Sequence, residues 1–190
     1  MKTILKNGTR VIIANARLSY ANIFEPRKGL NGDEEKYSVS ILIDKSDADT
    51  VEKINEAIAN ATEDGKTRRW SGKVPKNLKT PLRDGDEERD DEAYAGCYFI
   101  NANSKMKPEV VGKERDAATG KPIRLGPEDV YSGCYANVSV NFYAYNVSGN
   151  SGIACGLGNI QKERDGERLS GGASASEDFD FTDADDDFLG

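Results

Sequence analysis

Histidine is absent from this 190-residue sequence, and cysteine is scarce. Without histidine, the chain cannot form a catalytic triad that uses an imidazole base or a histidine-ligated metal site. The three cysteines are odd in number and show no C-x-x-C spacing, which indicates neither a disulfide framework nor a zinc site. We therefore interpret Cys97, Cys134 and Cys155 as small buried apolar residues in a reducing compartment.

Long apolar runs are also lacking. No segment approaches the roughly 20 apolar residues that are needed to span a bilayer. The N-terminus, MKTILKNGTR, turns polar after Leu5, before the apolar core of a signal peptide could form. We therefore expect a cytoplasmic protein without a membrane partner.

Nucleotide-binding loops are missing as well. The Gly-Lys pairs at Gly112 and Gly120 continue with Glu114 and Pro122, where a phosphate loop requires Ser or Thr. The Gly-Leu-Gly stretch at 156–158 lacks the third glycine of a dinucleotide-binding turn. We predict no cofactor, no metal and no enzymatic activity.

The charges that are present are strongly segregated. The net charge of −7 arises from residues 173–190, which carry seven acids and no base, because residues 1–172 carry 26 of each sign. Residues 66–83 hold seven bases without an acid, and the acidic run 84–92 follows directly. The acidic run could bind a divalent ion, although such runs are usually solvated. This segregation predicts a patterned surface potential.

Hydrophobic periodicity predicts several short strands and one long helix. Alternation indicates strands at 11–13 with a continuation over 16–20, at 36–44, 96–102 and 131–147, with some strand at 109–111 and a last strand near 152–157 that ends at Gln161. Helical spacing of Val51, Ile54 and Ile58 predicts a helix over 48–62. Residues 65–92 are expected to form a long exposed loop. This order is typical of a mainly β fold, a small antiparallel barrel or a sandwich.

The strand at 131–147 has two contrasting faces. One face is apolar and is predicted to lie in the core: Ala136, Val138, Val140, Phe142 and Ala144. The other combines three tyrosines with uncharged polar groups: Tyr135, Asn137, Ser139, Asn141, Tyr143 and Tyr145. Aromatic rings stack on the bases of single-stranded nucleic acid while Lys and Arg follow its backbone. The alternative is that the tyrosines cover a second layer or a contact in a homodimer.

The basic segment, residues 66–83, contains the one tryptophan of the sequence. Trp70 follows Arg68 and Arg69 directly, and Lys73 and Lys76 come soon after. We interpret this segment as a cationic groove with a stacking ring. The alternatives are a solvated lysine loop and a tryptophan that only fastens the loop to the barrel. Further candidate contacts are Lys105 and Lys107 in a later loop, and a rim formed by Tyr20, Phe24 and Arg27.

The C-terminal segment combines seven acids with three phenylalanines. A flexible polyanion of this kind can occupy a cationic groove and compete with nucleic acid. The sequence Asp185, Asp186, Asp187 and Phe188 offers an apolar anchor beside steering charge, which favours docking to a partner protein. The alternative is that the acids only keep the protein soluble.

Four sequence blocks carry a family resemblance: RLSYANIFEP, YFINANSKMKPEVV, DVYSGCYANVSVNFYAYN and GIACGLGNIQKERDGERL. They resemble a phage-encoded family of single-stranded DNA-binding proteins over most of residues 10–170. The resemblance implies an OB-fold barrel over 1–168, a disordered acidic tail over 169–190, DNA binding without sequence preference and a location in the host cytoplasm. It also implies that the tail recruits replication proteins such as polymerase and helicase. Here Phe188 is followed by Leu189 and Gly190, whereas such tails commonly end at or beside the aromatic residue.

We thus predict a protein that coats single-stranded DNA during phage replication or recombination. The expected DNA contacts are Trp70, Arg68, Arg69, Lys73, Lys76, Lys105, Lys107, Tyr135, Tyr143 and Tyr145. One rival hypothesis is an acidic DNA mimic that inhibits a host nucleic-acid enzyme. Another is a magnesium-dependent nuclease that uses the acids of 84–92. RNA as the ligand stays open, because stacking does not read the sugar.

Overall fold

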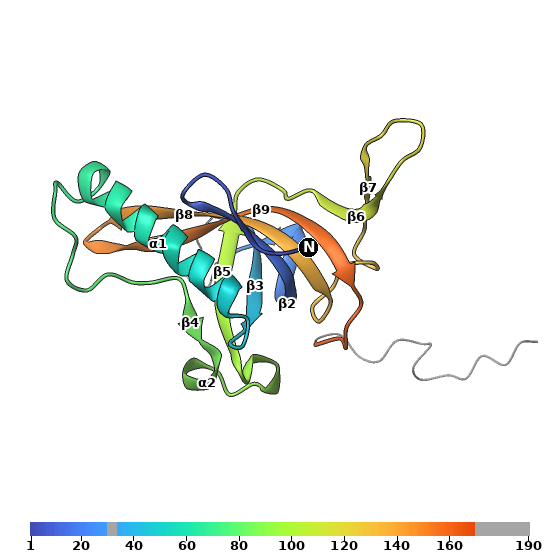
Figure 1. Ribbon diagram of the computed structural model, residues 1–190, viewed down its shortest axis with the longest axis horizontal. Coiled ribbons are helices and arrows are strands. Elements are labelled where there is room, and N and C mark those ends of the chain that lie inside the picture. The colour runs from blue at the N-terminus through green and yellow to red at the C-terminus, as the bar shows by residue number, and fades with distance from the viewer. Residues whose placement is uncertain (30–33, 170–190) are drawn as a thin grey trace, which may run out of the picture.

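The computed structural model describes residues 1–29 and 34–169. A long helix lies against a curved sheet, and a hairpin projects from the other end of the molecule (Figure 1). The strands are β1 (Ile4–Leu5), β2 (Arg10–Arg27), β3 (Lys36–Asp44), β4 (Arg83–Asp84), β5 (Cys97–Ser104), β6 (Val110–Arg115), β7 (Pro122–Arg124), β8 (Tyr135–Val147) and β9 (Asn150–Arg164). The helices are α1 (Ala48–Arg68), α2 (Gly85–Glu88) and a 3-10 turn at Glu92–Tyr94.

Five of the strands close into a barrel. Neighbouring strands follow the order β5, β3, β2, β8 and β9, and β9 returns to β5 through a parallel pairing of Gly156 with Asn103. The other four contacts in the ring are antiparallel. This arrangement is the OB-fold-like barrel that was predicted, and it resolves the choice between barrel and sandwich.

The alternating strands place their apolar residues inside the barrel. Leu18, Ile41, Ile100 and Val138 come from four different strands and are fully buried. The predicted apolar face of β8 is also buried throughout, as expected. Cys134 and Cys155 are buried as predicted, whereas Cys97 is half-buried.

Helix α1 begins where its sequence predicts and ends later. Its start is capped by Asp47, whose side chain accepts a hydrogen bond from the Thr50 backbone N–H. It continues to Arg68 instead of ending at residue 62, because Ala61 and Gly65 are buried against the barrel. Tertiary packing therefore adds helical turns that the polar local sequence does not predict.

The prediction that residues 65–92 form one long exposed loop is wrong in large part. Its first residues belong to α1, and its acidic end folds into α2 and the 3-10 turn. These short helices cover a second, smaller core in which Tyr94 and Phe99 contact edge to face at 5.2 Å, with Leu42 beside them. The acidic run is thus an ordered cap on the outer side of β3 and β5.

The predicted tail at 169–190 lies outside the described residues except for Leu169. In the part of the chain that the structure describes, no helix has the length and apolar character that a membrane crossing requires.

Candidate nucleic-acid interface

The topology singles out one outer face of the barrel. OB folds bind oligonucleotides on their second and third strands and on the loops that join strands 1 to 2 and 4 to 5. In this chain the second and third barrel strands are β3 and β5, and the loop from strand 4 to strand 5 is the turn at Ser148 and Gly149 between β8 and β9. Candidate DNA contacts should therefore lie on this face and at the β8–β9 turn.

The outer surface of β3 and β5 is polar but carries little charge. Ser38 lies opposite Asn103, and Ser40 lies opposite Asn101 in the strand register. Asn101 is exposed, and Ser38 and Asn103 are half-buried. The sequence analysis did not select these amides, although the alternation in CYFINANS could have indicated them.

Of the three tyrosines on the predicted aromatic face of β8, Tyr143 is exposed, at 45%, whereas Tyr135 and Tyr145 are half-buried. A Cβ on Gly156 would lie 3.6 Å from its Cε1 atom, so the ring borders this glycine of β9. Gly156 of β9 pairs with Asn141 of β8 on one side and with Asn103 of β5 on the other. The ring therefore lies two strands, or roughly 10 Å, from the polar face of β5.

Arg68 and Arg69 lie beside Tyr143. All three line one pocket of about 210 Å³ at the end of α1, together with Asn141. The Thr9 hydroxyl donates a hydrogen bond to the Asn141 side-chain oxygen at 3.0 Å and holds that amide in position. The structure thus brings together three residues that were predicted to bind DNA.

Lys73 and Lys76 are exposed on the loop that follows α1. The end of this loop is fastened to the β8–β9 hairpin, where the Ile153 backbone N–H donates to the Lys79 carbonyl at 2.9 Å. Both lysines therefore lie between the C-terminus of α1, where Arg68 and Arg69 are found, and the contact of the loop with the β8–β9 hairpin.

Trp70 does not have the exposure that a stacking ring requires. Its side chain is only 7% exposed and belongs to the main core. The indole N–H donates to the Tyr145 carbonyl at 3.4 Å, and the ring packs on Gly65 of α1. The prediction of an exposed Trp70 is wrong, and the alternative of a fastening residue describes its position.

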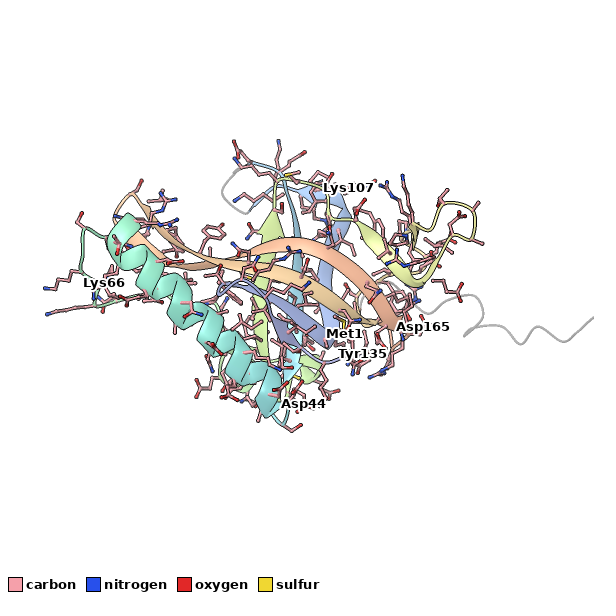
Figure 2. All side chains as sticks on the ribbon, turned by 45° about the horizontal axis from the view of Figure 1, so that its top comes forward. Met1, Asp44, Lys66, Lys107, Tyr135 and Asp165 are labelled. Carbon is pink, nitrogen blue, oxygen red and sulfur yellow. The ribbon has the colours of Figure 1, made fainter. Side chains whose placement is uncertain are left out.

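Tyr135 is half-buried, and other groups of the chain pack on its ring. The Arg164 guanidinium lies 3.5 Å from its ring centre, that of Arg17 lies 5.9 Å away, and the backbone at Gly166 packs on the ring edge. Figure 2 shows Tyr135 beside Asp165, far from Lys66 at the end of α1. Tyr135 is the first residue of β8, so it lies well along the strand from Tyr143.

The remaining members of the polar face of β8 are structural. Tyr145 is half-buried because its ring lies across Gly152, whose Cβ would be 2.6 Å from the tyrosine oxygen. Asn137 is 4% exposed and donates to the side chains of Gln161 and Glu163 at 3.0 Å. Ser139 is 8% exposed and accepts from the Asn159 backbone N–H.

Lys105 and Lys107 lie on the loop after β5 and are exposed. Lys105 forms an ion pair with Glu34, and its hydrogen bond lowers the pKa of that carboxyl group. Lys107 is distant from Lys66 in Figure 2. The predicted bases therefore form two groups, at the end of α1 and after β5, with the outer faces of β9 and β5 between them.

The acidic run 84–92 is held by ion pairs instead of forming a metal site. The Lys45 ammonium lies 2.6 Å from Asp84 and 2.7 Å from Asp86, and its hydrogen bonds lower the pKa of both carboxyl groups. Among the described residues, no group of three or more cysteine or carboxylate side chains is arranged to hold a metal ion.

The chain is similar to phage proteins over most of its length. A family model described as "Enterobacter phage Enc34, ssDNA-binding protein" matches residues 9–189. The chain belongs to the Enc34 single-stranded DNA-binding protein family. "Putative protein p50" of Acyrthosiphon pisum secondary endosymbiont phage 1 is 32% identical over 181 residues, which cover 90% of this chain and 92% of that relative.

Two solved structures of phage single-stranded DNA-binding proteins share the fold of this chain over most of its length. The single-stranded DNA-binding protein of bacteriophage Enc34 in complex with ssDNA has a TM-score of 0.75 at 23% identity and covers 88% of this chain and 93% of its own. The gp2.5 single-stranded DNA-binding protein of bacteriophage T7 has a TM-score of 0.54 at 14% identity, with 93% of both chains covered. At these identities the likeness shows a shared fold.

Proposed function

We propose that this protein binds single-stranded DNA without sequence preference and coats exposed strands during phage DNA replication or recombination. Membership of the Enc34 family supports this function. The observation that carries it is the exposed Tyr143 ring in one pocket with Arg68 and Arg69. An aromatic ring beside guanidinium groups can stack on a base and bind the adjoining phosphate.

The strand would run from the end of α1 across β9 to the loop after β5. Arg68, Arg69 and Tyr143 form its first contacts, and Lys105 and Lys107 form its last. Each neutralised phosphate releases condensed counterions, so affinity should decrease steeply with added salt. Lys73 and Lys76 lie beside the first contacts. Trp70 and Tyr145 support this surface through packing instead of stacking on bases, and Tyr135 lies apart from it.

We further propose that the chain comprises a DNA-binding domain over residues 1–168 and a tail over 169–190. The seven acids of the tail would compete with DNA for the basic residues. Asp185, Asp186, Asp187 and Phe188 would dock on replication proteins such as polymerase or helicase.

A fluorescence titration against single-stranded DNA, duplex DNA and RNA of matched length, at several salt concentrations, tests DNA binding. We expect the tightest binding to single-stranded DNA and a linear decrease of log K with log salt. No affinity for any oligonucleotide would contradict the proposal and favour the DNA mimic. Labelled strands incubated with magnesium should stay intact, and cleavage would favour the nuclease.

Removal of residues 173–190 tests the tail. The truncated protein should bind single-stranded DNA more tightly at low salt and should no longer capture polymerase or helicase. A full-length variant whose tail acids are replaced by Asn and Gln should show the same gain in DNA affinity. If neither protein binds more tightly than the parent chain, the tail does not compete.

A further inference from the structure

A second cleft, of about 360 Å³, opens on the outer face of the barrel away from the end of α1. It lies over β2, β3 and β5 and is bordered by the acidic cap. Its lining comprises Tyr20, Asn22, Ser38, Val39, Ser40, Arg89 and Asn101. Apart from Arg89 these residues are uncharged, so the floor of the cleft offers amide and hydroxyl groups and carries no carboxylate.

Tyr20 is held in this cleft by a strained backbone. Its φ angle is +45°, a left-handed conformation that is rare for a bulky residue, and its side chain is 61% exposed. The register of β2 with β3 shifts between Ser19 and Asn22, as at a β-bulge, which re-aims a side chain. The Asn22 side chain donates to the Tyr20 carbonyl at 3.2 Å, and the Ala21 N–H donates to Ser132. Strain of this kind persists where the surrounding structure imposes it, and it is concentrated at functional sites.

Arg89 is the one base in the acidic run 84–92. Its guanidinium carbon lies 5.0 Å from the ring centre of Phe99 and 5.4 Å from that of Tyr94. None of the ion pairs formed by residues 1–29 and 34–169 includes Arg89, although carboxylates flank it in the sequence. The two rings therefore orient a guanidinium group at the cleft, where no carboxylate of the described residues forms an ion pair with it.

We propose that this cleft is a subsite for one nucleotide of single-stranded DNA. The Tyr20 ring stacks on the base, and Arg89 binds the adjoining phosphate. Asn22 and Asn101 can hydrogen-bond the base or sugar edge, since an amide both donates and accepts. The acidic cap thus holds a phosphate-binding arginine at the DNA face. The subsite rests on the proposed function and extends its DNA path across β3 to β2.

Salt-dependent titration of the full-length protein with oligothymidylate tests Arg89. Each phosphate contact contributes about 0.7 to the slope of log K against log salt for single strands. Arg89→Gln should therefore lower the slope by about 0.7, and Arg89→Lys should keep it. Lys2→Ala removes an exposed charge beside the start of α1 and serves as the matched control, with no change in slope.

The same titration tests Tyr20. Tyr20→Ala should weaken binding about 5-fold to 150-fold at constant slope, the range of one lost stacking contact, whereas Tyr20→Phe should bind like the parent protein. Tyr20→Gly relieves the left-handed strain, so it should raise the unfolding temperature and still weaken binding. A residue with a purely structural role would not separate stability from affinity in this way.

The outcomes distinguish the subsite from the general function. If the parent protein binds no oligonucleotide, DNA binding itself is wrong, and the subsite is wrong with it. If the parent binds while Tyr20→Ala and Arg89→Gln, both folded by circular dichroism, match it in affinity and slope, the subsite alone is overturned. A lower slope for Arg89→Gln together with weaker binding by Tyr20→Ala supports it.

Discussion

Gly65 of α1 lies directly against Ala144 of β8. A Cβ atom on Gly65 would be 2.4 Å from the Ala144 Cβ and 2.8 Å from Cζ3 of Trp70. The absence of a side chain at Gly65 thus lets the last turn of α1 approach the barrel. This contact fixes the position of Arg68 and Arg69 next to Tyr143.

Gly65→Ala should destabilise the protein although alanine favours a helix. The helical gain of up to about 1 kcal/mol is smaller than the cost of forcing a methyl group into a filled contact, about 1–3 kcal/mol. Urea denaturation should show a lower midpoint for the variant. Ala144→Gly in the same chain removes one of the two opposing groups and should restore part of the loss, because the Trp70 ring still opposes the new methyl group; an unchanged midpoint in the single variant would contradict the contact.

Trp70→Ala should lower the free energy of unfolding by about 3–5 kcal/mol, because it removes a buried ring from beneath α1. Urea denaturation measures this loss. Trp70→Phe keeps most of the buried area and should cost less. A variant that stays as stable as the parent but loses DNA affinity would instead support a stacking role for Trp70.

Tyr143→Ala should weaken binding to single-stranded DNA by about 1–3 kcal/mol through the loss of one stacking contact. Tyr143→Phe retains the ring and should bind normally. The matched comparison is Tyr135→Ala on the same strand, which should have little effect because Arg164 covers that ring. Fluorescence anisotropy measures the DNA affinity of all three variants. Equal losses of affinity in Tyr143→Ala and Tyr135→Ala would contradict the proposed DNA path.

The double variant Arg68→Gln, Arg69→Gln should decrease the slope of log K against log salt by about 1.4 if each arginine contacts one phosphate. Replacement of both by lysine should keep the slope, since the charge is retained. Titrations with the same oligonucleotide at four salt concentrations are sufficient. A double glutamine variant with the parent slope would exclude the end of α1 from the DNA path.

Lys45 should stabilise the acidic cap at neutral pH and not in acid. Because Lys45 lowers the pKa of Asp84 and Asp86 in the folded state, their contribution is complete above the ordinary aspartate pKa of about 3.9. It is lost as the pH decreases through the lowered folded values. Lys45→Met should therefore reduce the urea midpoint at pH 7 more than at pH 2. An equal reduction at both values would contradict this linkage.

Local sequence patterns predicted most of the elements of this protein. Two-residue alternation identified β3 at its observed bounds and the buried face of β8, because side chains of a strand point to opposite sides in turn. The helical spacing of Val51, Ile54 and Ile58 predicted the start of α1, which Asp47 caps in the structure. The segregated charges and the tyrosine-rich strand also indicated a nucleic-acid ligand before any fold was known.

The exposure of each ring was decided by tertiary structure. Trp70 is buried because Gly65 allows α1 to close over it, and Tyr135 is covered by an arginine from β9. Tyr20 reaches solvent through a bulge in β2, and Arg89 reaches the outer face through the fold of the acidic cap. The sequence by itself determined the elements and the residue types available for binding. The fold decided which of them share a surface, because that depends on pairing between segments distant in the chain, which local periodicity does not encode.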